Sequence, residues 1–139
     1  MSGGLDAPGE TEMAKPATAF EWVGGEEAVR RLVDRFYDLM DLEPQFGQLR
    51  AAHGPSLDAA RDKLFWFLCG WLGGPNHYIE RFGHPMLRAR HLPFKIGIME
   101  RDQWVRCMMQ AMDECQLDPV LQERLTESFM GTANHMRNV

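Results

Sequence analysis

Residues 83–94, GHPMLRARHLPF, interrupt the helical pattern of this sequence and contain its most informative histidine. Proline lacks a backbone N–H and clashes with the preceding turn, so Pro85 and Pro93 confine any helix here to the few residues between them. Within that short segment His91 follows Leu87 by four residues, which places both side chains on one helical face. The imidazole of His91 is therefore expected to face an apolar space.

The surroundings of His91 fit the axial ligand of a haem. Phe94 and Ile96 follow it closely. A neutral imidazole between apolar walls is a standard ligand of haem iron, with its second ring nitrogen held by a backbone carbonyl. Three cations flank it and could pair with the two haem carboxylates: Arg88, Arg90 and Lys95. The same features also fit a histidine that packs in a core, with its arginines in water.

A second interpretation uses all three histidines of this region. His77, His84 and His91 are each seven residues apart, a spacing that would align them on a continuous helix and suggest a zinc or iron site. Gly83 and Pro85 exclude that helix, and no Asp, Glu or Cys completes a set of ligands. We therefore expect no multi-histidine metal site, and expect His84 to hydrogen-bond backbone in a turn.

Amphipathic helices lie on both sides of this connector. Apolar residues recur at three- and four-residue steps in four long segments: residues 26–42, 56–71, 100–115 and from 118 onward. Ser56 and Asp118 are expected to cap two of these helices, with Pro119 in the first turn of the last. Residues 43–55 are expected to be a looser stretch. No alternating strand pattern occurs, so the predicted class is all-α.

Composition and charge narrow the function classes. The chain has 139 residues, 45% of them apolar and 25% charged, and a net charge of −5, which suits one folded domain and disfavours nucleic-acid or anionic-membrane partners. Residues 1–19 lack periodic apolar positions, so we expect a disordered tail there and a folded domain over residues 20–139. No apolar run approaches the roughly 20 residues that span a bilayer, and signal-peptide features are absent, so a cytoplasmic location is expected.

Four strings carry a resemblance to a known family. They are RFY at residues 35–37, GWLGGP at 70–75, GHPMLRARHLPF at 83–94 and ERDQWVRCM at 100–108. In order and spacing they resemble the group II truncated haemoglobins, from about residue 22 to residue 134. The resemblance implies a truncated globin fold, a two-over-two helical sandwich enclosing a b-type haem, with His91 as the proximal iron ligand.

The resemblance also implies residues on the distal side of the haem. Tyr37 and Trp104 match positions from which an O–H and an N–H can donate hydrogen bonds to a dioxygen ligand, although each alone would also fit a helical core. Ala60 matches the distal gate, where it can neither ligate iron nor donate. The other candidate haem-contact residues are Leu64, Phe67, His84, Leu87, Arg88, Arg90, Phe94 and Ile96.

A third polar residue of the distal side is expected in the loop before residue 56. His53 is the best match at this position. Loop length differs among relatives, and His53 fits an exposed loop position equally well. Both interpretations of His53 stay open at this point.

The leading functional hypothesis is a haem protein that binds dioxygen, and also CO and NO, reversibly at a five-coordinate ferrous iron with slow release. No residue is assigned a catalytic role. The alternative is a haem enzyme acting on peroxide or nitric oxide, which would need an unidentified reductase. A third hypothesis, a haem-free helical module, predicts a colourless protein. The resemblance suggests a homodimer.

Overall fold

The computed structural model describes residues 17–139, so all but the last three residues of the predicted tail at residues 1–19 lie outside them. The described part is helical, as expected, with these bounds: α2 Ala19–Val23, α3 Gly25–Leu42, the 3-10 turn η1 Pro44–Phe46, α4 Gly47–Ala51, α5 Asp58–Trp71, α6 His77–Phe82, α7 Leu87–His91, α8 Ile98–Glu114 and α9 Pro119–Met136. None of these helices is long and apolar enough to cross a bilayer.

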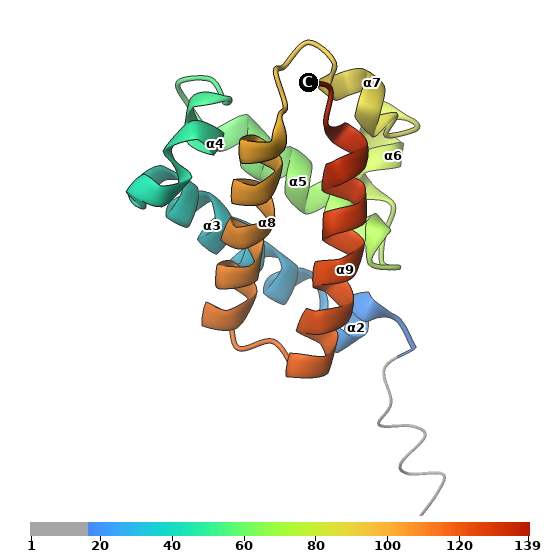
Figure 1. Cartoon of the computed structure of the whole chain (residues 1–139). Helices are drawn as coiled ribbons and strands as arrows, with labels where there is room; N and C mark the ends of the chain where they lie inside the picture. The colour runs from blue at the N-terminus through green and yellow to red at the C-terminus, as the bar shows by residue number, and fades with distance from the viewer. Residues whose placement is uncertain (1–16) are drawn as a thin grey trace, which may run out of the picture.

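Four long helices form the body of the molecule (Figure 1). The helices α8 and α9 lie side by side, and α3 and α5 cross behind them. Contacts join α3 to both α5 and α8, and join α8 to α9. The short helices α6 and α7 lie at one end of the body, close to where the chain ends.

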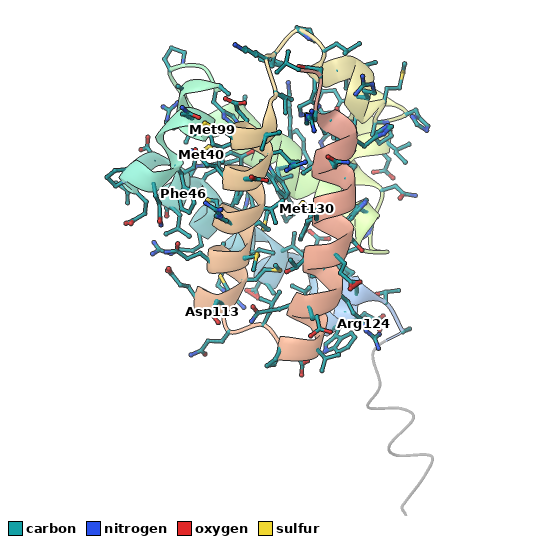
Figure 2. The ribbon with its side chains drawn as sticks, viewed as in Figure 1. Met40, Phe46, Met99, Asp113, Arg124 and Met130 are labelled. Carbon is teal, nitrogen blue, oxygen red and sulfur yellow. The ribbon has the colours of Figure 1, made fainter. Side chains whose placement is uncertain are left out.

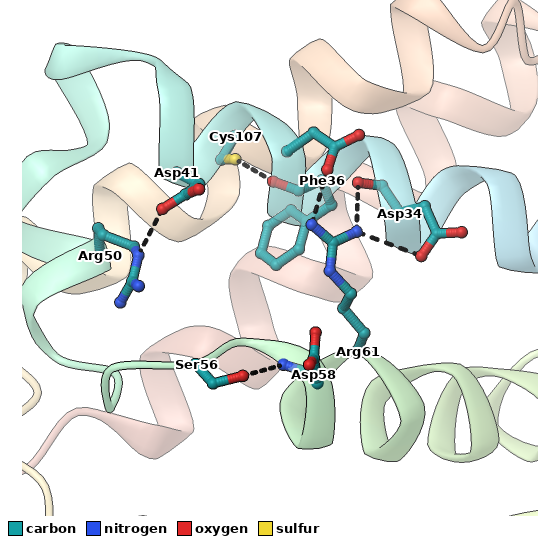
Figure 3. Close-up of polar contacts among 9 residues, drawn as sticks. Asp34, Phe36, Asp41, Arg50, Ser56, Asp58, Arg61 and Cys107 are labelled. Carbon is teal, nitrogen blue, oxygen red and sulfur yellow. Dashed lines mark hydrogen bonds and ion pairs between the residues drawn. The ribbon is translucent and has the colours of Figure 1, made fainter.

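The core forms where the apolar faces of these helices meet. The side chains of α3 that are almost completely buried are Val29, Leu32, Val33, Phe36, Leu39 and Met40. Met40 and Phe46 belong to this core, whereas Asp113 and Met130 are exposed (Figure 2). Two thiols, Cys69 and Cys107, are fully buried, and Cys107 Sγ donates a hydrogen bond of 3.2 Å to the carbonyl oxygen of Phe36 (Figure 3).

Several predicted helix boundaries differ from the structure. Most of the looser stretch predicted at 43–55 is helical, because buried Phe46 and Leu49 anchor η1 and α4, and only residue 43 and residues 52–55 lie outside a helix. These turns are too short to show a helical period in the sequence. Ser56 Oγ does accept a hydrogen bond from the backbone of Asp58, but the N-cap position of α5 is Leu57. The folded part also begins slightly before residue 20, since α2 starts at Ala19.

The predicted cap of the last helix is confirmed and gives a stability test. Asp118 Oδ1 accepts hydrogen bonds from the backbone N–H groups of Val120 at 2.8 Å and Leu121 at 3.3 Å. Asp118→Ala is expected to lower the free energy of unfolding by about 1 kcal/mol, measured by urea denaturation. Asp113→Ala, at an exposed position near the end of α8, should change stability by less than about 0.5 kcal/mol; equal effects of both substitutions would contradict the capping role.

Candidate haem site

The imidazole of His91 is oriented as an axial ligand requires. His91 is half-buried at the end of α7, and its Nδ1 lies 2.7 Å from the carbonyl oxygen of Leu87. A carbonyl oxygen can only accept a hydrogen bond, so Nδ1 carries the hydrogen, and Nε2 keeps its lone pair for a metal. The predicted bond from the second ring nitrogen to a backbone carbonyl is therefore present.

His84 has the opposite hydrogen-bonding pattern. Its Nδ1 accepts a hydrogen bond of 3.2 Å from the backbone N–H of Met86, a residue in the left-handed conformation with φ of 47°. In the neutral ring the hydrogen is then on Nε2, which becomes a donor. This exposed donor is suited to bind a carboxylate, and the predicted backbone bond in a turn is confirmed.

A cavity of about 530 Å³ opens between α5, α7 and the end of α9. Its lining includes four of the predicted haem-contact residues: Phe67, His84, Leu87 and Arg88. The cavity is largely open to solvent, and the His91 imidazole is not part of its lining. Phe67 also lines a second cavity of about 150 Å³, between α5 and α6.

The arginines of α7 make different contacts from those expected. Arg88 Nη1 donates to the carbonyl oxygens of His135 at 2.8 Å and Arg137 at 3.0 Å. Arg90 Nε donates to the carbonyl oxygen of Pro85 at 2.6 Å. Both guanidinium groups therefore hold backbone segments around α7 together, and their pairing with haem carboxylates stays a prediction.

Tyr37 and His53 lie together, outside the lining of the larger cavity. Tyr37 is only 4% exposed, and its ring centroid lies 6.0 Å from that of His53 in an edge-to-face arrangement. His53 is half-buried, so the exposed-loop interpretation is wrong. Its Nδ1 donates to the carbonyl oxygen of Leu49 at 2.9 Å, which leaves Nε2 as an acceptor.

Arg50 holds the turn that carries His53. Its guanidinium donates to the carbonyl oxygens of Gly54 at 2.8 Å and Pro55 at 2.9 Å, while Nε pairs with Asp41 of α3 at 2.9 Å (Figure 3). Arg61 of α5 makes a similar bridge to α3, with its Nη2 at 2.6 Å from Asp38. These bridges fix the elements that carry Tyr37 and His53 relative to one another.

Trp104 on α8 is linked to Tyr37 through the aromatic core. Its indole packs against Phe36 at 5.2 Å and Phe129 at 5.4 Å between centroids, and Phe36 packs edge-on against Tyr37 at 4.9 Å. The series continues from Phe129 through Trp71 to Phe67. Among residues 17–139, no group accepts a hydrogen bond from the Trp104 indole or the Tyr37 hydroxyl, so both donors are free for a ligand.

The remaining predicted residues lie on α5 and in the loop after α7. Ala60 and Leu64 are half-buried on α5 and pack against the core. Ile96 is half-buried in the loop after α7, whereas Phe94 is 51% exposed. The sequence arguments missed Asn138, which contacts this loop from the far end of the chain; nothing in its local sequence indicates that contact.

The electrostatics of His53 give a second test. Burial lowers the pKa of His53 below 6.5; the backbone hydrogen bond to Leu49 opposes this shift, and the charges of Arg50 and His91 add to it. In the unfolded chain His53 takes up a proton near pH 6.5, whereas in the folded chain it does so only at lower pH. The free energy of unfolding therefore falls as the pH drops below 6.5. His53→Gln should reduce this loss of stability, measured by urea unfolding above and below pH 6.5, whereas substitution of the exposed His135 should not.

Comparisons with known proteins return globins. The model of the bacterial-like globin family matches residues 18–138. A group 2 truncated haemoglobin of Bacillus subtilis is 42% identical over 114 residues, 82% of this chain and 84% of that protein. Among solved structures, a group II 2-on-2 haemoglobin from the plant pathogen Agrobacterium tumefaciens has a TM-score of 0.86 at 42% identity and covers 90% of this chain and 97% of its own. A truncated oxygen-avid haemoglobin from Bacillus subtilis has a TM-score of 0.80 at 40% identity. The match covers 87% of this chain and 99% of that haemoglobin. The predicted two-over-two fold is confirmed.

Proposed function

Since the chain belongs to the group II truncated haemoglobins of the bacterial-like globin family, we propose that it binds a b-type haem through His91 and holds dioxygen reversibly with slow release. The observation that carries this proposal is the His91 imidazole, whose Nδ1 bonds to the carbonyl oxygen of Leu87 at 2.7 Å and whose Nε2 is free. The haem, when bound, supplies an iron atom with a sixth position for dioxygen, CO or NO.

The chain offers a matching group for each part of the haem. Phe67 and Leu87 line the cavity with apolar surface. His84 presents an Nε2–H donor at the rim, where a haem carboxylate would lie. His91 supplies the axial nitrogen. The donor set therefore fits this cofactor in kind: one unprotonated nitrogen, apolar walls, and a donor at the edge.

The distal residues explain why release should be slow. Dioxygen in such a pocket carries partial negative charge, and Trp104 and Tyr37 are donors that no described protein group occupies. Burial raises the pKa of Tyr37 far above its ordinary value, so the hydroxyl keeps its proton and can donate. Each hydrogen bond to the ligand is worth roughly 1 kcal/mol or more in a dry site. His53 Nε2 is an acceptor and would compete with the ligand for the single hydroxyl hydrogen of Tyr37, so Trp104 is expected to be the stronger donor.

Absorption spectra of the ferric, ferrous and oxygenated protein test this proposal. We expect a strong Soret band, a five-coordinate ferrous spectrum and a stable oxygenated form. A colourless protein would support the haem-free module instead, and a ferrous spectrum with two nitrogen ligands would contradict the open sixth position. Turnover of peroxide or nitric oxide with a supplied reductase would favour the enzymatic alternative.

A further inference from the structure

The segment after α9 folds back onto the loop that follows His91. The side-chain Nδ2 of Asn138 donates to the carbonyl oxygens of Phe94 at 2.8 Å and His91 at 3.4 Å. Its Oδ1 accepts from the backbone N–H of Ile96 at 3.0 Å, and its own backbone N–H donates to the carbonyl oxygen of Ile96 at 2.9 Å. One residue thus spans the loop over residues 91–96, including the backbone of the proposed ligand.

The helix that carries His91 depends on contacts of this kind. The helix α7 has five residues, no side-chain cap and a left-handed residue, Met86, before its first turn. A helix this short is not stable on its own, because fixing the backbone of its first turn costs more free energy than the hydrogen bonds of that turn supply. The start of α7 is held by Arg88, which donates to the carbonyl oxygens of His135 and Arg137. Its end is held by Asn138, and Figure 1 shows the chain end beside α7.

We propose that Asn138 is a positioning residue for the proximal ligand, fixing the height and rotation of the His91 imidazole relative to the haem. This proposal rests on the proposed haem ligation by His91. The imidazole is oriented by its Nδ1–H bond to Leu87, and that bond requires α7 to keep its helical turn. The side chain of a metal ligand must be held to within about 0.5 Å of its working position by the residues around it. The Asn138 amide supplies such support from outside α7.

The amide group of asparagine is specific for this arrangement. It donates to two carbonyl oxygens and accepts from one N–H, and each partner belongs to the loop backbone. An aspartate at this position has almost the same shape but no donor, and its charge would face the carbonyl oxygens of His91 and Phe94. Asn138→Asp therefore removes the support with little change in volume, whereas Asn138→Ala removes the whole group.

The test uses the haem-loaded protein and a matched control. Asn134, four residues earlier, accepts from Arg101 of α8 at 2.8 Å, and no hydrogen bond joins it to residues 91–96. In Asn138→Ala and Asn138→Asp, the iron–histidine stretching band of the ferrous protein should shift and broaden. Transfer of haem to excess apomyoglobin should be about tenfold faster in both variants, because both lose the two hydrogen bonds to the carbonyl oxygens of His91 and Phe94, and Asn138→Ala also loses the bond from Ile96. Asn134→Ala should keep the wild-type band and a transfer rate within about twofold.

Hydrogen exchange of the Ile96 amide gives a readout that does not depend on iron. Its N–H donates to Asn138 Oδ1, so exchange should be faster in Asn138→Ala than in the wild type or Asn134→Ala. A wild-type band and transfer rate in both Asn138 variants would overturn the positioning role while leaving haem ligation intact. A wild-type protein without an iron–histidine band would overturn ligation by His91, and the positioning role with it.

Discussion

His91→Ala is expected to abolish stable haem binding, and added imidazole should restore part of it. The neighbouring His84 is poorly suited to replace the ring. His84 has its Nδ1 bonded to the backbone of Met86 and its other nitrogen protonated. His53 packs against Tyr37 and its Nδ1 is bonded to the backbone of Leu49. Free imidazole can then supply the nitrogen that the variant lacks.

Haem content and the Soret band of the purified variant measure this effect. His77→Ala is a suitable control, because His77 at the start of α6 pairs with Glu26 of α3 at 3.3 Å and lines neither of the two cavities. Its haem content should equal that of the wild type. Normal haem content and an unchanged spectrum in His91→Ala would reject His91 as the axial ligand.

Trp104→Phe is expected to raise the dioxygen dissociation rate by about one to two powers of ten. Phenylalanine keeps an aromatic ring against Phe36 and Phe129 but removes the indole N–H. Losing a donor in a dry pocket costs roughly 1–3 kcal/mol, and about 1.4 kcal/mol corresponds to a tenfold change in rate. Stopped-flow displacement of dioxygen by CO gives the rate directly.

Ala60→Val separates hydrogen bonding from access to the site. Ala60 is half-buried on α5 and has no donor to lose, so this substitution should act on ligand association and leave the dissociation rate closer to that of the wild type. Tyr37→Phe should have a smaller effect than Trp104→Phe, because His53 can also accept from the Tyr37 hydroxyl. If Trp104→Phe leaves the dissociation rate within a factor of about two, the indole is only core packing.

Sequence periodicity predicted the long helices well and the short ones poorly. The face of α3 that carries Leu32 and Phe36 repeats over several turns, and local chemistry at Asp118 marked the start of α9. By contrast, α4 has only five residues and is held by contacts made elsewhere. One of these is the hydrogen bond from the backbone of Leu49 to Gln103 of α8, 54 residues later. No local pattern encodes such a contact.

The same division applies to the site. A short motif and its apolar spacing identified His91, and the structure confirmed the expected backbone bond of its ring. The backbone partners of Arg88 were not predicted, because they are carbonyl oxygens 47 and 49 residues away in the sequence. Asn138 was missed for the same reason. Its side chain reaches back 42 to 47 residues, a distance that only the folded chain reveals.

The two buried thiols, Cys69 and Cys107, can report how often the core of this protein opens to solvent. Burial raises the pKa of Cys107 to about 12 and that of Cys69 to about 11, so neither forms the reactive thiolate at neutral pH while the fold is closed. A thiol reagent can label them only during transient exposure of the core. Labelling followed by mass spectrometry would therefore time that exposure at two known places, one on α5 and one on α8, without any engineered probe.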